Sequence, residues 1–522
     1  MPRIIVFFCG ALLLVQVLYA SGSTPGNKAV PEESIPPYHW ANDLIIRLVD
    51  AGMLDLDPTN RPFNRGQVAA ALLNTTDSTT AKHPRYSELL GLLCNEFRQE
   101  MDILSADAEM DGWTGRAGAF LSVDGEAGGN NPDADWRAVS KLGVRIAPGF
   151  YAYHGACIDS HLAEDSTYTG KKWHDVGGYT EQGYFTLKLG RVNGWIGRNW
   201  VRWGPGRSGA LLVSDFSRSL NGIYMSVDLS PFTYRWGAFE LDRWASVTRF
   251  MSAHRVEWQP IDNLKLAASE MMLYSGENRS WELRYINPVS IWQFEQWGQL
   301  RGNVIWGMDA WWQLTRKFNA GLEFIVDDIQ VDRKIPEDLE PPEIGGLLAL
   351  VWNDPFEIIG SRWTFETVFV TQRTYKTKIP GESGLNYYRP IGWRQDNDVI
   401  NWRFDWDHIL SGKVLIGGFT EYTLKGEDRI IAPFDSSYED YTVDVGFDEP
   451  FPTGTVARTL TVSPYLEWIY SINMNARFSL FYSNSQNTGN NAGAEKSDWG
   501  VKINGSFYID SVRSFVKQIK HN

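Results

Sequence analysis

The feature that most constrains the fold is an alternation of apolar and polar residues that starts near Asp111 and runs almost to the end of the 522-residue chain. In Ile400–Asp407, one face carries Ile, Trp, Phe and Trp, while the other carries Asn, Arg, Asp and Asp. Similar runs surround Phe185, Ile223, Met474 and Trp499. A period of two over about ten residues predicts half-buried β-strands, so most of the chain is expected to be all-β.

The alternation alone does not say which face lies inside. In a soluble sandwich the apolar face forms the core, whereas in a membrane barrel it contacts lipid and the polar face lines the lumen. Aromatic residues make up 14% of the chain, which fits the aromatic belts of a membrane barrel, and a mean hydropathy of -0.30 excludes a polytopic helical membrane protein. Strand-like runs of roughly membrane-spanning length also favour the barrel.

The connections between the runs are of two lengths, as in outer-membrane barrels. The short ones are Pro260–Asn263 and Ser471–Asn473, and the long ones are Gly125–Asp135, Pro336–Glu343, Thr377–Asn386 and Ala432–Thr453. We therefore expect a transmembrane antiparallel β-barrel of about 16 to 18 strands over residues 106–510, followed by a basic C-terminal tail over 511–522.

The N-terminal part of the chain differs from the rest. A basic start, an apolar run and small residues predict a signal peptide over 1–23, and a polar linker follows over 24–37. Apolar residues then recur at helical spacing, predicting a small periplasmic helical bundle over 38–105. Its helices are expected around Trp40–Val49, ending at Gly52, then after Asn64, and over Tyr86–Leu104. Cys94 and Cys157 could pair in an oxidising compartment, but we expect them to be unpaired.

The chain offers little that points to catalysis. It contains no HExxH, CxxC, P-loop or GxSxG motif, and its eight histidines are scattered. Carboxylate pairs such as Asp327–Asp328 could serve a glycoside hydrolase, but an alternating strand with a hydrated lumen supplies them equally well. The net charge of -14 speaks against nucleic acid as a partner. We expect no enzyme, no cofactor and no bound metal.

The most distinctive local sequence is Gly197–Ser214, in which tryptophans, arginines and glycines surround one proline. Flat aromatic faces beside forked arginine donors suit a sugar, and an acidic sugar in particular, but a tight inter-strand turn with packing tryptophans explains the pattern equally well. The candidate polysaccharide-binding residues are Arg198, Trp200, Arg202, Trp203, Arg207 and Asp215. A second aromatic region, Trp281–Gln299, fits either sugar binding or an aromatic girdle at the membrane interface.

Two stretches carry a resemblance to a known family. Trp203–Gly206 reads Trp-Gly-Pro-Gly and is followed by Gly209, Leu211 and Ser214, while Ala41–Met53 is a leucine-rich run that ends in Asp-Ala-Gly-Met. Together they resemble the Wzi family of capsule-assembly outer-membrane proteins. The resemblance implies an 18-stranded outer-membrane barrel with a periplasmic helical bundle, acting as a lectin that attaches capsular polysaccharide or exopolysaccharide to the cell surface, without catalysis.

Two other classes of protein are also consistent with the sequence. An outer-membrane porin with an N-terminal cell-wall-binding helical module would share the signal peptide, the helices and the barrel, and a secreted β-rich glycoside hydrolase would share the alternation. We expect the protein to be a monomer in outer-membrane lipid, with polysaccharide as its partner.

Overall fold

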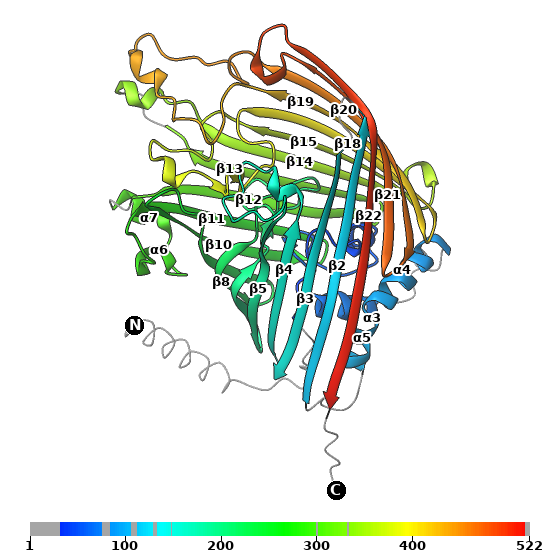
Figure 1. Ribbon diagram of the computed structural model, residues 1–522. Coiled ribbons are helices and arrows are strands. Elements are labelled where there is room, and N and C mark those ends of the chain that lie inside the picture. The colour runs from blue at the N-terminus through cyan, green and yellow to red at the C-terminus, as the bar shows by residue number, and fades with distance from the viewer. Residues whose placement is uncertain are drawn as a thin grey trace.

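The computed structural model describes residues 32–75, 84–105, 112–128, 133–147, 149–298, 301–330 and 334–516. The predicted signal peptide lies outside these ranges. The main body is a closed barrel of 18 strands in which all pairings are antiparallel, as the sequence predicted (Figure 1). The barrel strands are β2 (Gly112–Gly128), β3 (Asp133–Ala147), β4 (Phe150–Asp159), β5 (Gly177–Leu189), β6 (Val192–Asn199), β8 (Leu220–Asp228), β9 (Phe232–Glu240), β10 (Val247–Ile261), β11 (Leu264–Glu277), β12 (Asn303–Thr315), β13 (Phe318–Asp328), β14 (Glu343–Asn353), β15 (Ser361–Val370), β18 (Val399–Ser411), β19 (Val414–Lys425), β20 (Ala457–Ser471), β21 (Met474–Gln486) and β22 (Glu495–Val516).

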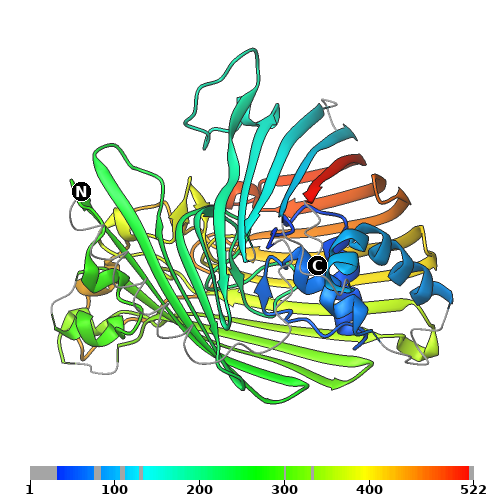
Figure 2. The same cartoon turned by 90° about the horizontal axis from the view of Figure 1, so that it is seen from below.

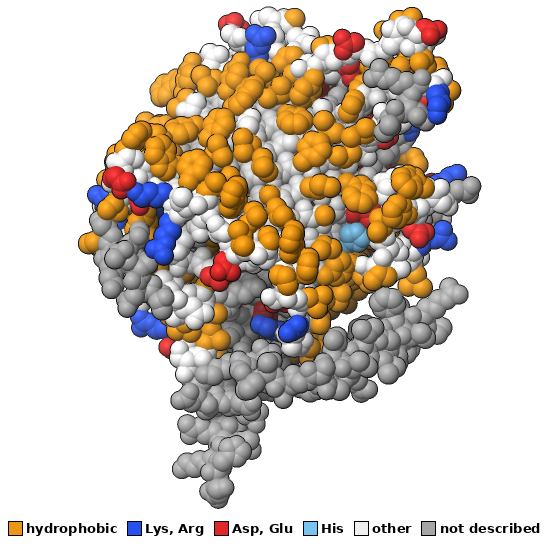
Figure 3. Space-filling view, turned by 180° about the vertical axis from the view of Figure 1, so that it is seen from behind, with side chains coloured by type: hydrophobic (Ala, Val, Ile, Leu, Met, Phe, Trp, Pro, Cys, Tyr) orange, Lys and Arg blue, Asp and Glu red, His pale blue; other side chains and the backbone are white. Residues whose placement is uncertain are grey.

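The apolar face of the strands points outward. On β13, Leu322 and Phe324 are 54% and 42% exposed, whereas Glu323 between them is 5% exposed and faces the interior. On β18, Phe404 and Trp406 are likewise exposed while Asn401 and Asp407 are buried. Apolar side chains cover most of the wall seen in Figure 3. An apolar exterior around a polar interior is the arrangement of an outer-membrane barrel.

The two ends of the barrel differ in their connections. At one end the turns are short, as between Ile261 and Leu264, and at the other long segments join β13 to β14, β15 to β18 and β19 to β20. By analogy with outer-membrane barrels, the short turns are periplasmic and the long segments extracellular. One predicted long connection is corrected, because most of Gly125–Asp135 belongs to β2 and β3.

The last strand corrects a predicted boundary as well. β22 continues to Val516 instead of ending near Asp510, because Ser511–Val516 pairs with Gly112–Ala117 of β2. This pairing closes the barrel between its first and last strands. The remaining residues of the predicted tail, 517–522, lie outside the described ranges.

Four α-helices lie in the described part of the N-terminal region: α2 (Ala41–Asp50), α3 (Arg65–Leu73), α4 (Pro84–Glu96) and α5 (Arg98–Ser105). The predicted third helix is therefore two helices separated at Phe97. As expected, α2 is followed by Gly52, whose φ of +65° suits a residue without a side chain.

Cys94 and Cys157 are not paired. None of the helices among the described residues combines the length and apolarity needed to cross a bilayer.

These helices lie at the short-turn end, opposite the long loops (Figure 2). The Glu88 carboxylate of α4 accepts a hydrogen bond from the Gly412 N–H in the turn between β18 and β19. Apolar residues of α2, α3 and α4 share one core with inward-facing barrel residues, among them Phe120, Val139 and Ile409. The helical region is therefore packed into the periplasmic mouth of the barrel.

Among the described residues, two short α-helices, four short strands and six 3₁₀-helices lie outside the barrel sheet. α6 (Leu283–Ile286) and α7 (Trp292–Trp297) lie in the connection between β11 and β12, at the long-loop end. β1 (Asn60–Arg61) pairs with β7 (Arg202–Trp203), and β16 (Leu385–Asn386) pairs with β17 (Arg389–Pro390), apart from the barrel sheet.

Candidate functional site

The segment Trp200–Ser219, which follows β6 and contains most of the predicted site, turns into the barrel and is called the plug segment below. Its strand β7 pairs with β1, which precedes α3, so the plug segment and the periplasmic helical region are joined by backbone hydrogen bonds. Trp203 is 1% exposed and packs in an apolar cluster with inward-facing residues of the wall such as Ile305 and Val368. The Trp-Gly-Pro-Gly motif is thus buried in the lumen.

Two carboxylates of the barrel wall hold the backbone of the plug segment. Glu323 of β13 accepts hydrogen bonds from the N–H groups of Leu211 at 2.8 Å and Leu212 at 3.0 Å. Glu366 of β15 accepts the N–H of Arg207 at 2.6 Å. Buried backbone N–H groups are costly to leave unpaired, so these acidic residues of the polar lumen face stabilise an irregular segment that has few ladder bonds of its own.

The arginines of the plug segment are paired within the protein. Arg202 contacts Asp215 at 3.1 Å and donates to the carbonyls of Gly206 and Gly209 at 2.7 and 3.0 Å. Arg207 forms an ion pair with Asp50 at the end of α2. Burial lowers the pKa of the Arg207 guanidinium, and the Asp50 carboxylate opposes that shift. Both arginines therefore stabilise the plug segment through contacts within the protein.

Gly204 shows why the motif needs glycine. Its φ is +122°, and a Cβ at this position would lie 2.6 Å from a carboxylate oxygen of Glu323. A side chain would thus be strained in its backbone and would also collide with the residue that holds the plug segment. The neighbouring Pro205 packs against Gly321 of the wall. A side chain at position 321 would collide with the proline, because a Cβ on Gly321 would lie 2.8 Å from the proline ring.

One strand shows how the lumen is filled along its height. Three inward-facing residues of β13 each hold a different internal element. Near the periplasmic turn, the Asn319 amide donates to the Asp50 carbonyl of α2 at 2.8 Å. Glu323 accepts from the plug segment, as described above. Near the extracellular end, Asp327 accepts the N–H of Tyr375, which belongs to the loop 371–398 between β15 and β18, at 2.5 Å.

The loop 371–398 also packs directly onto the plug segment. The Tyr375 hydroxyl donates to the Leu211 carbonyl at 2.6 Å, and the N–H of Ser214 donates to the Ile391 carbonyl at 2.7 Å. Trp393 is completely buried against Gly209. Helix α2, the plug segment and this loop therefore occupy successive levels of the barrel interior.

A polar pocket of about 320 Å³ opens at the extracellular end of this assembly, and we call it the mouth pocket. Arg198, at the end of β6, is the one predicted site residue that lines it, and its guanidinium donates to the Thr180 carbonyl at 3.0 Å. The other lining residues come from strand ends and loops: Thr169, Asn221, Glu240, Leu241, Asp242, Arg243 and Tyr387.

Two aromatic residues adjoin lining residues of the mouth pocket in the chain, Trp244 beside Arg243 and Tyr388 beside Tyr387. Trp244 stacks on Tyr388 with 5.7 Å between ring centroids and 7° between ring planes, and Tyr388 is 42% exposed. On the loop between β4 and β5, Trp173 is 72% exposed. Below the pocket, the Arg218 guanidinium lies 4.7 Å from the centre of the Tyr387 ring. Cations, carboxylates, an amide and flat rings thus meet at one solvent-facing place.

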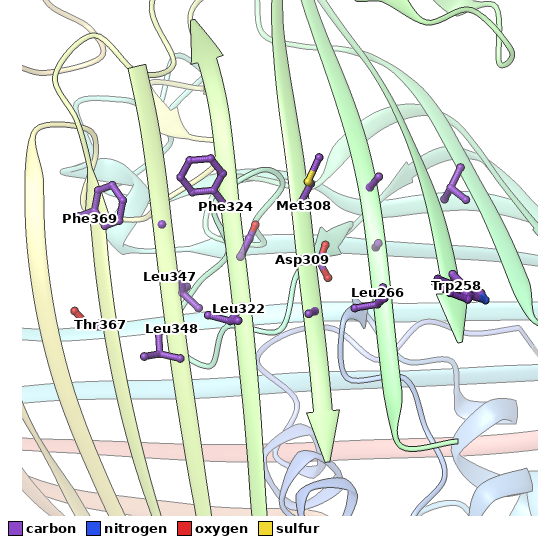
Figure 4. A pocket seen from close by; sticks show the side chains of 16 residues that line it. Trp258, Leu266, Met308, Asp309, Leu322, Phe324, Leu347, Leu348, Thr367 and Phe369 are labelled. Atoms are coloured by element: carbon purple, nitrogen blue, oxygen red, sulfur yellow. The ribbon is translucent and has the colours of Figure 1, made fainter. Parts of the chain in front are cut away.

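A second hollow, of about 740 Å³, lies against the wall strands β10 to β15 and has a different character. Its lining is mainly outward-facing and apolar, with Trp258, Met308, Leu322, Phe324 and Phe369 around small residues (Figure 4). Because it opens on the lipid-facing side of the barrel, it suits hydrocarbon and offers little to a sugar.

The structure divides the six predicted site residues into two groups. Trp200, Arg202 and Trp203 are buried, Arg207 and Asp215 are 12% and 20% exposed, and all five belong to the internal packing. Arg198 alone reaches the mouth pocket. Five lining residues were not predicted from the sequence: Asn221, Glu240, Asp242, Arg243 and Tyr387. Their position at the ends of alternating runs or in the connections is the signal that the sequence offers for them. Within the described ranges, no group of three or more His, Cys, Asp or Glu residues is placed to hold a metal ion.

Comparisons with known proteins agree with this architecture. Residues 127–496 match the family model described as capsule assembly protein Wzi. Wzi of Escherichia coli, described as an outer membrane protein involved in group 1 capsule assembly and as a carbohydrate binding β-barrel, superimposes with a TM-score of 0.59 at 15% identity, covering 89% of this chain and 98% of that one. No curated protein matches the chain in a sequence search.

Two structures from Pseudomonas aeruginosa show a weaker likeness. OprD has a TM-score of 0.43 at 9% identity over 79% of this chain and 99% of its own. OpdK has a TM-score of 0.45 at 10% identity over 76% of this chain and 99% of its own.

Proposed function

Because the chain belongs to the Wzi family of capsule assembly proteins, we propose that it is an outer-membrane lectin that binds capsular polysaccharide or exopolysaccharide and helps attach it at the cell surface. The related barrel from E. coli is described as carbohydrate binding, which supports the same class of ligand here. The protein acts by binding, with no chemical step assigned to any residue.

The observation that carries the proposal is the mouth pocket. Sugars present hydroxyl groups and apolar ring faces, so their sites combine polar side chains with flat aromatic ones. The pocket provides Arg198, Arg243 and Asn221 on one hand and Tyr387 on the other, and exposed Tyr388 directly follows Tyr387 in the chain. The two arginines offer forked donors to the carboxylate of an acidic sugar, against the overall negative charge of the chain.

The filled interior supports binding at the surface over transport through the barrel. A porin needs a continuous aqueous passage, whereas α2, the plug segment and the loop 371–398 occupy the lumen at successive levels through direct hydrogen bonds to the wall. The proposed lectin needs no such passage. A polysaccharide chain is also long, so a site at the extracellular mouth can hold one stretch of it while the rest stays outside.

The test is glycan binding by the purified protein in detergent micelles, on an array that includes acidic and neutral capsular polysaccharides. We expect Arg198→Ala combined with Arg243→Ala to reduce binding at least tenfold, because each lost charge-assisted contact is worth about 1.5–3 kcal/mol. Cells that carry the double variant should release capsule into the medium.

The matched control is Arg191→Ala, since Arg191 is an exposed arginine at a short periplasmic turn. It should bind like the wild type. Wild-type protein that binds no glycan on the array, together with normal capsule retention in cells lacking the protein, would remove the proposed function. Loss of binding with Arg191→Ala as well would point to general unfolding or bulk charge, against a local site.

A further inference from the structure

The connection between β11 and β12 folds over the outside of the barrel wall instead of into the lumen. We call residues 278–298 of this connection, which contain α6 and α7, the outer flap. Beneath it lie side chains that alternate with the lumen-facing ones and therefore point outward, among them Phe250, Met272 and Tyr274. They are 3%, 0% and 1% exposed and form an apolar cluster with Tyr285 and Trp292 of the flap.

Polar contacts fix the outer flap to the wall. Glu270 of β11 faces outward beside His254 of β10, with 3.1 Å between its carboxylate and the imidazole Nε2. The same carboxylate accepts the N–H groups of Trp292 at 2.9 Å and Gln293 at 2.8 Å. The Trp292 ring stacks on the imidazole with 4.5 Å between centroids. The flap thus covers an ionisable pair that would otherwise face hydrocarbon, where such groups are costly.

The opposite side of the outer flap is apolar and exposed. In α7, Phe294 and Trp297 are three positions apart, follow Ile291 by the same spacing, and so form one stripe along the helix. The exposed apolar side chains of the flap are Leu283 (68%), Val289 (83%), Ile291 (43%), Phe294 (58%) and Trp297 (73%). A cluster of this size is unfavourable in water and marks a contact with an apolar partner.

The identity of that partner follows from the neighbouring surface. Further along β10 and on the nearby strand β12, the outward positions include Val256, Trp258 and Met308, which are 46%, 44% and 61% exposed on the lipid-facing wall. The apolar side of the flap therefore continues the lipid-contacting surface of the barrel. Arg284, which is 66% exposed, and exposed Glu295 flank this side, as is usual for segments at headgroup level.

From these contacts we infer that the outer flap is a lipid-binding element, inserted among the acyl chains of the outer leaflet with Ile291, Phe294, Trp297 and Val289 in contact with hydrocarbon. It anchors the extracellular end of the barrel on one side. It also keeps the His254–Glu270 pair away from lipid. The element is separate from the mouth pocket, so the proposal goes beyond polysaccharide binding.

The test is spin-label accessibility in vesicles of phosphatidylethanolamine and phosphatidylglycerol. Single labels are placed with Val289→Cys, Phe294→Cys or Trp297→Cys in a Cys94→Ser, Cys157→Ser background. Leu322→Cys, at an exposed wall position, serves as the lipid reference, and Trp173→Cys, in an extracellular loop, serves as the water reference. Heat-modifiable gel mobility verifies that each labelled barrel is folded.

We expect the three flap labels to collide with dissolved oxygen and to be shielded from a water-soluble nickel chelate, as the label at 322 is and the label at 173 is not. Accessibility to the nickel chelate at all three positions would overturn the proposal and identify the flap as a water-facing surface. Shielding from both reagents would overturn it as well, in favour of a protein partner or a second copy of the chain. Neither result depends on whether the protein binds a glycan.

Discussion

The plug segment and the outer flap have similar compositions and opposite positions. Both are tryptophan-rich and arginine-containing excursions from the extracellular ends of strands, yet the first turns into the lumen and the second folds over the wall. Inside, the arginines meet carboxylates and carbonyls and the indole of Trp203 is buried. Outside, Trp297 is 73% exposed. The polar lumen therefore buries and pairs the aromatic and arginine side chains of one segment, whereas the apolar outer wall leaves those of the other segment exposed.

The largest expected effect tests this difference directly. Trp203→Ala should destabilise the folded barrel by about 3–5 kcal/mol, because it removes a large, fully buried side chain and leaves a cavity. Chemical unfolding of the purified protein in micelles measures it. Trp297→Ala in the outer flap is the matched control and should change stability by less than about 0.5 kcal/mol. Equal effects at the two tryptophans would show that the plug segment contributes no more to stability than the exposed flap does.

The next effect concerns the connection between the plug segment and the helical region. Asp50→Asn removes the charge that pairs with Arg207, while its backbone carbonyl still accepts from Asn319 and Asn353. We expect a loss of about 1.5–3 kcal/mol, the value of a hydrogen bond between charged groups, and a rise in the frequency of ion-conducting events in planar bilayers. Unchanged conductance with lowered stability would mean that the plug stays in place without this ion pair.

The smallest expected effect is a loss of stability at acidic pH, and it arises from His39, a buried residue of the helical region inside the barrel. Burial, together with the charges of Lys141, Arg65 and Arg116, lowers the pKa of the His39 imidazole well below 6.5. Below about pH 6.5 the unfolded chain therefore binds a proton that the folded protein does not, so this histidine reduces stability as the pH falls and has no such effect above it.

His39→Gln should remove that contribution. Its unfolding free energy relative to the wild type should rise between pH 8 and pH 5, as measured by denaturant titration at each pH. A difference between the two proteins that stays constant over this range would contradict a neutral buried imidazole.

The strands were predictable because alternation is a local property. Ile400–Asp407 lies within β18, and the short turn after Ile261 is where the sequence placed it. The alternation itself did not show which face of the strands lies inside, because a β-sandwich gives the same pattern. The lengths of the runs and of their connections favoured the barrel. The end of β22 was misjudged because its last residues are held by β2, about 400 positions away in the chain.

The candidate site was predictable only in part. The Trp-Gly-Pro-Gly motif is a local sequence, but its position in the lumen depends on Glu323 and Glu366, which lie more than 100 residues further along. Arg198 was identified because it adjoins the motif. Tyr387 and Asn221 reach the mouth pocket from separate connections, and no spacing in one sequence brings such residues together.

The pairing of β1 with β7 has a consequence for the order of assembly. Residues 60–61 and 202–203 meet inside a cylinder whose seam is formed by β2 and the very last strand, β22. The pairing therefore joins a segment that precedes the first wall strand, β2, to a segment that follows the fifth, β6. The contents of the lumen are thus connected to the wall through the chain on both sides of β2–β6, so the native interior cannot be complete before these five strands have been brought together.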